Sequence, residues 1–390
     1  MERCDVLIVG GGPAGSSCAR RLASAGLDVV VLDKAVFPRD KVCAGWITPA
    51  VLDELELDAA DYAQGRVLQP ISAFRVGLES GPALEIEYPQ PVSYGIRRCE
   101  FDHYLLARCG ARLRLGEALE SLVREADGWV VNERYRAPML IGAGGHFCPV
   151  AQWLQQTVGQ RAEEPRVAAQ EAEFLLDERQ RAECRVEAHR PELYFCRDLA
   201  GYGWCFRKGD YLNVGLGRED ARRLPEHVAA FHQRLRSEGR IPAGPTGRFR
   251  GHAYLLFAHA RREVLGDGVL LVGDAAGIAY AESGEGIRPA IESGLLAGDV
   301  VLGRGEGRPE GLARGGAAGF DGRGRYRRER LERYRVLLER RFGPRGRGAA
   351  RPGPSRFRRA MAAWLLARRW FVRNVVLDRW FLRAGVAPLR

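Results

Sequence analysis

Three glycines and one acid near the start of the chain have the spacing of a dinucleotide-binding site. They are Gly10, Gly12, Gly15 and Asp33, within VLIVGGGPAGSSCARRLASAGLDVVVLD. Gly10 allows a tight turn, Gly12 lets the backbone approach a pyrophosphate, and Gly15 lets a helix pack closely on a strand. Free N–H groups at the start of that helix favour bound negative charge, and Asp33 would accept hydrogen bonds from a ribose. These residues predict dinucleotide binding, for which NAD and FAD are both candidates.

The elements around these residues are those that such a site requires. The pattern predicts a buried strand over 4–10, a helix over 14–25 that ends at Gly26, and a second strand over 28–33. The glycines therefore lie between a strand and a helix, the context in which this motif is specific.

A second glycine-marked turn occurs in GVLLVGDAAGIAYAESGEGIRPAIESG, residues 268–294. We expect a strand at 269–272, followed by Gly273 and Asp274 and then by a helix beyond Gly284. The acid on that turn would accept a ribityl hydroxyl, and the helix N-terminus would face the electron-rich edge of a flavin. A fold that binds only a nicotinamide does not need this second site, so the two motifs together predict FAD.

These motifs and several shorter stretches resemble a known family. GGGPAG, Gly273–Gly277 (GDAAG) and Gly284–Ile287 (GEGI) are similar to those of FAD-dependent oxidoreductases of the para-hydroxybenzoate hydroxylase fold. Four further stretches resemble the geranylgeranyl reductase branch of that fold: Phe37–Gly45 (FPRDKVCAG), Arg98–Leu105 (RCEFDHYL), Tyr202–Phe206 (YGWCF) and Asn213–Gly217 (NVGLG). The resemblance spans about residues 5–298.

The resemblance implies an α/β fold in which a discontinuous Rossmann-like FAD-binding domain holds an inserted substrate domain. The substrate domain would be a mixed or antiparallel β-sheet, and a helical extension would follow. The expected ranges are 1–60, 95–160 and 255–300 for the FAD-binding domain, 61–94 and 161–254 for the substrate domain, and 301–390 for the extension. A hairpin is expected within 66–94, with its turn near 80–82.

The resemblance also implies which residues bind the cofactor. Arg98 would contact the flavin-side phosphate or ribityl chain, Asp274 the ribityl and pyrophosphate groups, and Gly284–Ile287 the isoalloxazine ring. The residues expected to bind FAD are Gly10, Gly12, Pro13, Ala14, Gly15, Asp33, Lys34, Arg98, Gly273, Asp274, Gly284, Gly286 and Ile287. The strand end at 140–145 (LIGAGG) would pack beside the pyrophosphate.

The chain departs from the family at a few positions. Isoprenoid reductases usually have proline near Ala281 and glycine at Glu285, and aromatic hydroxylases typically have histidine at Gly277. The halogenases of this fold carry a tryptophan–x–tryptophan–x–isoleucine segment and a catalytic lysine. Here the corresponding stretches read GWCF and CAGWITP with no lysine beyond, which disfavours halogenation.

Flavin chemistry needs few acid–base groups from the protein. Cys43 is the candidate proton donor, because by resemblance its segment lies near the substrate side of the flavin; the alternative is a buried small hydrophobic residue. Trp46, Tyr202 and Trp204 are expected to line the substrate cavity, with core aromatic residues as the alternative. Glu285 would contact the ring or the substrate, or would cap a helix. His146 and His252 have no identifiable partner and are interpreted as structural or surface residues.

Basic charge is concentrated in residues 301–390, which hold 24 arginines and 7 acids, while the whole chain has a net charge of +11. Gly, Arg and Pro dominate 303–354, with a helix expected at 325–341 and a linker at 343–355. The Trp- and Arg-rich stretch 358–382 predicts a terminal helix docked on the body. Attachment to an anionic membrane surface is the alternative. A nucleic-acid partner is not expected, because no recognised binding fold accompanies the charge.

Composition and cysteine spacing favour a cytoplasmic protein. No apolar run approaches about 18 residues, and no signal segment precedes the first strand. The nine cysteines are scattered without a CxxC pair, which predicts neither a disulfide framework nor a metal site. Peripheral attachment at the inner membrane surface is the alternative location.

The sequence therefore predicts an FAD-dependent oxidoreductase that reduces a carbon–carbon double bond of a hydrophobic, isoprenoid-like small molecule. Electrons would come from NAD(P)H, bound transiently, or from a partner reductase, because no second dinucleotide motif is present. The alternative is a flavin-dependent monooxygenase that hydroxylates or epoxidises a small-molecule or biosynthetic intermediate. A flavin-binding scaffold without turnover is a third class.

Overall fold

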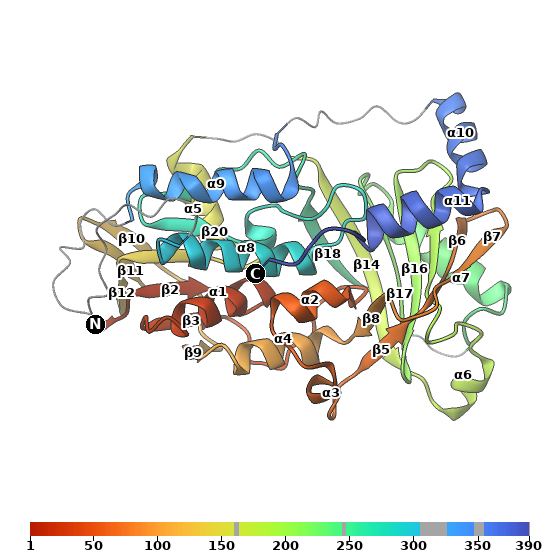
Figure 1. Ribbon diagram of the computed structural model, residues 1–390, viewed down its shortest axis with the longest axis horizontal. Helices are drawn as coiled ribbons and strands as arrows, with labels where there is room; N and C mark the ends of the chain where they lie inside the picture. The colour runs from red at the N-terminus through yellow and green to blue at the C-terminus, as the bar shows by residue number, and fades with distance from the viewer. Residues whose placement is uncertain (160–163, 244–246, 305–325, 347–354, 390) are drawn as a thin grey trace.

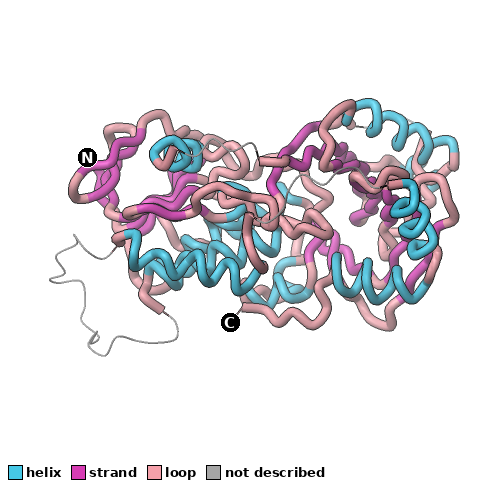
Figure 2. The backbone as a smooth tube through the Cα atoms, turned by 90° about the horizontal axis from the view of Figure 1, so that it is seen from above, coloured by secondary structure: helices cyan, strands magenta, loops and turns pink. Residues whose placement is uncertain are grey.

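Two β-sheets lie toward opposite ends of the long axis of the molecule, with helices packed around them (Figure 1). The view from above shows the same two groups of strands (Figure 2). This computed structural model describes residues 1–159, 164–243, 247–304, 326–346 and 355–389. The six-stranded sheet carries the first glycine motif, and the seven-stranded sheet carries the predicted hairpins.

The six-stranded sheet has the order β19-β20-β13-β2-β3-β9, and its neighbouring strands are parallel except for β19 and β20. Its central strands are continuous hydrophobic runs, because several helices and a small four-stranded sheet share one core with them. The strands are β2 (Val6–Val9), β3 (Val29–Asp33), β9 (Arg112–Leu115), β13 (Met139–Gly142), β19 (Leu265–Gly266) and β20 (Val269–Leu271). The elements packed on them are α1 (Pro13–Ala23), α8 (Ile287–Val301), β1 (Glu2–Arg3), β10 (Leu122–Glu125), β11 (Gly128–Val131) and β12 (Tyr135–Ala137).

The strand–turn–helix–strand unit predicted from the first motif is present as β2, α1 and β3. Helix α1 ends just before Gly26, whose φ of +87° is the left-handed conformation expected after a helix C-terminus. A Cβ atom at Gly15 would collide with the carbonyl oxygen of Gly10. The helix therefore packs on the strand end as closely as the motif predicted.

The seven-stranded sheet has the order β18-β14-β17-β16-β15-β6-β7 and is antiparallel except between β15 and β6. The predicted hairpin is present as β6 and β7, which are joined by residues 79–82. The strands are β6 (Ala73–Leu78), β7 (Ala83–Glu87), β14 (Arg166–Leu175), β15 (Glu192–Phe195), β16 (Gly201–Lys208), β17 (Tyr211–Arg218) and β18 (Arg250–Leu255).

Shorter elements complete the body of the protein. A three-stranded sheet has the order β4-β8-β5 and consists of β4 (Trp46–Ile47), β5 (Leu68–Ile71) and β8 (Ser93–Ile96). The helices are α2 (Pro49–Glu54), α3 (Ala59–Tyr62), α4 (Arg98–Ala107), α5 (Pro149–Thr157), α6 (Glu178–Glu183) and α7 (Leu224–Ser237). In the part of the chain that the structure describes, no helix combines the length and the apolar composition needed to cross a membrane.

The C-terminal extension is helical, as predicted, but its helices join two different cores. Helix α9 (Arg328–Phe342) packs on the six-stranded sheet, where the buried Tyr334 hydroxyl donates a hydrogen bond of 2.8 Å to the Leu271 carbonyl. The elements that pack on the seven-stranded sheet are α10 (Arg356–Leu366), α11 (Arg369–Phe371) and the π-helix η2 (Val372–Phe381). The predicted linker at 343–355 lies mostly outside the described residues.

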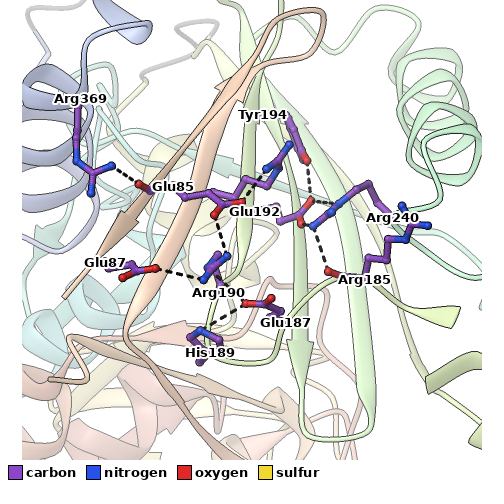
Figure 3. A network of polar contacts seen from close by, with 11 residues as sticks. Glu85, Glu87, Arg185, Glu187, His189, Arg190, Glu192, Tyr194, Arg240 and Arg369 are labelled. Atoms are coloured by element: carbon purple, nitrogen blue, oxygen red, sulfur yellow. Dashed lines mark hydrogen bonds and ion pairs between the residues drawn. The ribbon is translucent and has the colours of Figure 1, made fainter. Parts of the chain in front are cut away.

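Arginines of this last segment donate hydrogen bonds to backbone carbonyls of β7, the edge strand of the seven-stranded sheet (Figure 3). Arg190 lies between the carboxylates of Glu85 and Glu87, at 2.9 and 3.4 Å. Arg369 of α11 donates to the backbone carbonyl of Glu85 at 2.7 Å. The predicted docking of a terminal helix on the body is therefore observed.

Helices α1 and α8 cross at a contact that permits no side chain. A Cβ atom at Gly294 would collide with the carbonyl oxygen of Ala14, whereas one at Gly298 would lie 2.8 Å from the Arg21 Cγ atom. Backbone atoms at this crossing cannot move aside, but the Arg21 side chain can shift at lower cost.

We expect Gly294→Ala to lower the midpoint of thermal unfolding clearly, because overpacking a core contact costs about 1–3 kcal/mol. Gly298→Ala is the matched control and should lower it less, since the Arg21 side chain can move aside; the roughly 1 kcal/mol by which alanine favours a helix over glycine applies to both variants. Equal midpoints for the two variants would show that the crossing does not limit stability.

Candidate functional site

A cavity of about 640 Å³ is lined by residues of both large sheets. Its volume is in the range of small-molecule and cofactor sites. At one end it contacts the first glycine motif, and at the other end it contacts aromatic side chains of the seven-stranded sheet. All the residues predicted to bind FAD line it except Gly15, which lies beneath the turn.

The first glycine turn forms one end of this cavity. Gly10 has a φ of +115°, and a Cβ atom there would collide with the carbonyl oxygen of Ala143. The strand end at 140–145 therefore runs directly beside the turn, as its interpretation from sequence proposed. The Asp33 carboxylate accepts hydrogen bonds from the backbone N–H groups of Gly11 and Ala35, at 2.7 and 2.8 Å. Asp33 thus stabilises the turn while it also lines the cavity.

Two arginines bring positive charge to the cavity around one buried carboxylate. Arg98, the first residue of α4, donates two hydrogen bonds to Asp102, of 2.7 and 2.8 Å, and Arg39 lies 3.2 Å from the same carboxylate. Burial would lower the pKa of Arg98, but Asp102 and the neighbouring Cys43 thiol raise it, so the guanidinium stays charged. The Arg39 Nη1 atom is buried and has no hydrogen-bond partner among the described residues. Two cations with one anion leave a net positive charge, which suits a pyrophosphate.

The second glycine turn, η1 (Gly273–Ala275), brings Asp274 to the same cavity. The His252 Nε2 atom lies 3.2 Å from the Asp274 carboxylate, and the Lys41 ammonium lies 2.9 Å from that nitrogen. Burial would raise the pKa of Asp274, but the His252 contact and the charges of Lys41 and Arg98 hold it well below its usual range. Burial lowers the pKa of Lys41, and Asp274 opposes that shift. Asp274 therefore stays ionised in the cavity.

Both histidines that were interpreted as structural or surface residues line the cavity, and His252 has a partner there that the sequence did not identify. His252 lies on β18 and contacts Asp274, a pairing for which the sequence holds no spacing signal because the strand and the turn are brought together only by the fold. Burial lowers the pKa of His146 to about 4, so its imidazole is neutral. Its Nδ1 atom has no hydrogen-bond partner among the described residues.

The turn before α8 lies between the two ends of the cavity. The Tyr202 hydroxyl donates to the Ser283 carbonyl at 2.5 Å, and a Cβ atom at Gly284 would lie 2.5 Å from the Tyr254 hydroxyl oxygen. The Glu285 carboxyl is buried, and burial raises its pKa to about 7 against the opposing effect of Arg288. Neither oxygen of this carboxyl has a hydrogen-bond partner among the described residues.

Aromatic side chains form the other end of the cavity. Trp46, Tyr202, Trp204 and Phe381 all line it. The Trp46 ring stacks on Phe381, with ring centroids 5.4 Å apart and an angle of 18° between the planes. Phe381 belongs to η2, so the C-terminal extension supplies part of the cavity wall. Sequence reasoning missed this role, because the apolar residues of 358–382 form no clean stripe that would mark one of them as facing a ligand.

Cys43 lines the cavity between these ends, and its backbone is held by the seven-stranded sheet. The Cys43 N–H donates to the Glu171 carboxylate at 2.8 Å, and the Cys43 carbonyl accepts from the Asn213 side chain at 3.1 Å. Its thiol sulfur accepts the Gly45 N–H at 3.4 Å. The thiol therefore lies at a fixed place in the cavity wall.

The residues present fit a flavin dinucleotide. The cavity follows a glycine turn at a helix N-terminus, passes two cationic side chains, of which Arg39 has an unpaired buried nitrogen, and ends among aromatic rings. A pyrophosphate, a ribityl chain and an apolar ring system need these surroundings in this order.

Comparisons with known proteins agree with this geometry. Residues 3–299 match the model of the FAD binding domain family. The chain is 30% identical to the menaquinone reductase of Mycolicibacterium smegmatis, over 77% of this chain and 76% of that protein. It is 31% identical to the digeranylgeranylglycerophospholipid reductase of Methanothrix thermoacetophila, over 77% of this chain and 78% of that protein.

A solved structure shares the fold along nearly the whole chain. It is a geranylgeranyl bacteriochlorophyll reductase-like protein of Thermoplasma acidophilum, with a TM-score of 0.70 and 21% identity, which covers 94% of this chain and 88% of that one. FAD is thus the cofactor of the cavity, as the two glycine motifs predicted. The chain belongs to the FAD binding domain family and is an FAD-dependent oxidoreductase of its geranylgeranyl reductase-like branch.

Proposed function

We propose that this protein reduces a carbon–carbon double bond in the isoprenoid chain of a hydrophobic substrate. The observation that supports this most directly is the continuity of one cavity, which joins a dinucleotide site to an aromatic chamber. A flexible apolar chain bound against Trp46, Trp204 and Phe381 would leave water and bring its double bond next to the flavin. The relatives named above, reductases of menaquinone and of digeranylgeranylglycerophospholipid, favour an isoprenoid substrate.

We assign the cofactor contacts to the residues predicted from sequence, together with Arg39. The N–H groups at the start of α1 would bind the pyrophosphate with Arg39 and Arg98, and Asp274 would accept ribityl hydroxyls. His252 and Lys41 would hold the Asp274 carboxylate in place. FAD, when bound and reduced, supplies the hydride for the reduction.

The protein itself would contribute two things to the reaction: it would position the substrate, and it would donate one proton to it. The aromatic chamber excludes water from the reacting carbons, and the Tyr202 hydroxyl holds the turn at Ser283 that separates the chamber from the dinucleotide end. Cys43 would donate its thiol proton to the substrate carbon that does not receive the hydride. Electrons would arrive from NAD(P)H or a partner reductase, because the described residues contain one dinucleotide turn of the strand–glycine–helix type.

A membrane contact of the C-terminal helices would bring such a substrate to the cavity. Phe357, Met361 and Trp364 recur at helical spacing on α10 and are all exposed, as is Trp370 of α11. Five arginines and no acids lie within 356–371. This combination of exposed aromatic rings and positive charge is complementary to the headgroup layer of an anionic bilayer. We propose an anionic lipid surface as the partner of the exposed face of α10 and α11.

The reaction is tested by incubating the dithionite-reduced protein with menaquinone, geranylgeranyl diphosphate or digeranylgeranylglycerophospholipid. We expect mass spectrometry to show a gain of two hydrogens in the isoprenoid chain of at least one of them, which for menaquinone is distinct from reduction of the quinone ring. Cys43→Ala should lower kcat by about 100-fold, which is typical of the loss of a general acid, while Cys99→Ala, outside the cavity, leaves it unchanged. A gain of one oxygen in air would instead identify a monooxygenase, and an unchanged set of masses would leave no support for the reduction.

The cofactor site is tested by Gly12→Ala. A Cβ atom at Gly12 would meet only the Arg39 Nη2 atom, at 3.5 Å, and the backbone there has no positive φ, so the apoprotein should fold normally. The methyl group would occupy the space of the pyrophosphate and weaken FAD binding by on the order of 10- to 100-fold, since overpacking costs about 1–3 kcal/mol. Gly81→Ala, in the β6–β7 turn, is the control. FAD titration of both apoproteins measures the effect, and equal affinities would place the pyrophosphate elsewhere.

The membrane contact is tested by flotation with phosphatidylglycerol vesicles. Because each arginine near an anionic surface contributes about 1 kcal/mol, Arg358→Ala with Arg359→Ala should reduce partitioning roughly 30-fold. Trp364→Ala should reduce it further, and high salt should weaken it in the wild type. Val336→Ala removes an exposed apolar side chain of α9 and serves as the control. If the wild type does not float at low salt, the proposed contact is wrong.

A further inference from the structure

Buried polar side chains of the seven-stranded sheet hold the peptide groups around Cys43. Glu171 on β14 accepts the Cys43 N–H, and Asn213 on β17 donates to the Cys43 carbonyl, at 2.8 and 3.1 Å. Lys208 on β16 donates to the carbonyls of Ala44 and Ile96, both at 3.0 Å. Glu171, Asn213 and Lys208 are all less than 9% exposed. Three adjacent strands therefore fix one short segment of the cavity wall.

The same Asn213 amide also holds the Trp204 indole. Its Oδ1 atom accepts the indole N–H at 2.7 Å, while its Nδ2 atom donates to the Cys43 carbonyl and to Glu171, with a longer contact of 3.3 Å to Glu173. The orientation of this amide is set by its neighbours, because Trp204 can only donate and Glu171, when ionised, can only accept. Neither Asn213 nor Glu171 lines the cavity, but Cys43 and Trp204 both do.

We propose that Glu171 and Asn213 are positioning residues that fix Cys43 relative to Trp204, and that loss of the negative charge on Glu171 releases this arrangement. Each oxygen of the Glu171 carboxylate accepts from one donor, the Cys43 N–H or the Asn213 amide N–H, and protonation places an O–H group at one of these oxygens. One of these hydrogen bonds is then lost, or the amide rotates and leaves the Trp204 N–H without its acceptor. Either outcome frees one of the two side chains that the cavity places beside the reacting carbons. The expected effect of Glu171 on the rate of substrate reduction rests on the proposed reductase function.

The surroundings of Glu171 place this change near neutral pH. Burial raises the pKa of Glu171 to about 7, while Lys208 and the two donors oppose the shift and Glu173 adds to it. Glu173 itself is paired with Lys208 and Arg97, and they hold its pKa below the ordinary value despite burial. Lys208, Glu173, Arg97 and the Cys43 thiol are therefore the charged and titratable groups around this site. Because the ionised form holds the arrangement, activity should rise with pH through about 7.

Exchanging the carboxylate and the amide between positions 171 and 213 tests whether Glu171 and Asn213 position Cys43 or only stabilise the sheet. In Glu171→Gln the new amide N–H faces the Asn213 amide, and in Asn213→Asp two carboxylates face each other. In the double variant, the amide introduced at position 171 donates to the carboxylate introduced at position 213. That carboxylate still accepts the Trp204 N–H, and the amide oxygen at position 171 still accepts the Cys43 N–H. The carboxylate at position 213 cannot donate to the Cys43 carbonyl as the Asn213 amide does, so the double variant should recover only part of what each single variant loses.

The first measurement is hydrogen–deuterium exchange of the FAD-bound protein, followed by mass spectrometry of the peptides that cover 39–47. We expect faster exchange there in Glu171→Gln and in Asn213→Asp than in the wild type, and an intermediate rate of exchange in the double variant, which restores the contact between positions 171 and 213 but not the bond to the Cys43 carbonyl. The matched control is Glu192→Gln, which removes another buried carboxylate of the same sheet, one that contacts Tyr194 and Arg240 outside the cavity (Figure 3). Exchange that rises equally over the whole sheet in all variants would overturn the proposal.

The second measurement is the pH profile of substrate reduction. Glu171→Gln should lower kcat on the order of 10- to 100-fold at pH 8, as expected when a reacting group is misplaced by about 1 Å, and should abolish the rise through about pH 7. The double variant should return to within about 10-fold of the wild type, with no such rise. Unchanged kcat in Glu171→Gln would contradict the inference. Should no substrate be reduced, the exchange experiment still decides it, so failure of the proposed function and failure of the positioning are distinguishable.

Discussion

Close backbone packing at the first glycine turn is the constraint on which the cavity depends. The Gly10 carbonyl lies against Gly15 of α1, Gly10 itself lies against Ala143, and α8 crosses α1 at Gly294 with no room for a side chain. These contacts bring β2, β13, α1 and α8 to one point, so the N-terminus of α1 opens on the cavity instead of being covered. Any side chain at this point would separate the elements, and with them the two glycine motifs that line one cavity.

Ion pairs and hydrogen bonds inside the protein determine which charges line that cavity. Asp102 is fully buried and neutralises only part of the charge of Arg39 and Arg98, which leaves a positive cavity wall. Asp274 is ionised because His252 and Lys41 face it. Below the wall, Glu173 and Lys208 neutralise each other, whereas Glu171 depends on hydrogen-bond donors that belong to the backbone and to an amide. An ion pair strongly favours the charged form of a side chain, whereas burial raises the pKa of Glu171 to about 7, as it does for Glu285 in the cavity.

Local sequence patterns predicted the parts of the fold that depend on local physics. The β2–α1–β3 unit, Gly26, the β6–β7 hairpin and the turn before α8 follow from glycine positions, β-branched runs and helical spacing. The residues that sequence reasoning missed act through contacts between distant elements. His252 contacts Asp274 from another strand, and Phe381 contacts Trp46 across more than 300 residues. Asn213 lies within the NVGLG stretch that resembles the family, but nothing in the sequence indicates that it bonds to Trp204. The ranges given for the two domains stay a prediction, as do the roles of individual site residues.

Phe381 gives the cavity a particular order of assembly. Of all the residues that line it, Phe381 is the last in the chain, and every other one precedes residue 291. During synthesis the dinucleotide end therefore leaves the ribosome long before the aromatic chamber has its final ring. The aromatic wall of the cavity is therefore complete only after Phe381 has been synthesised.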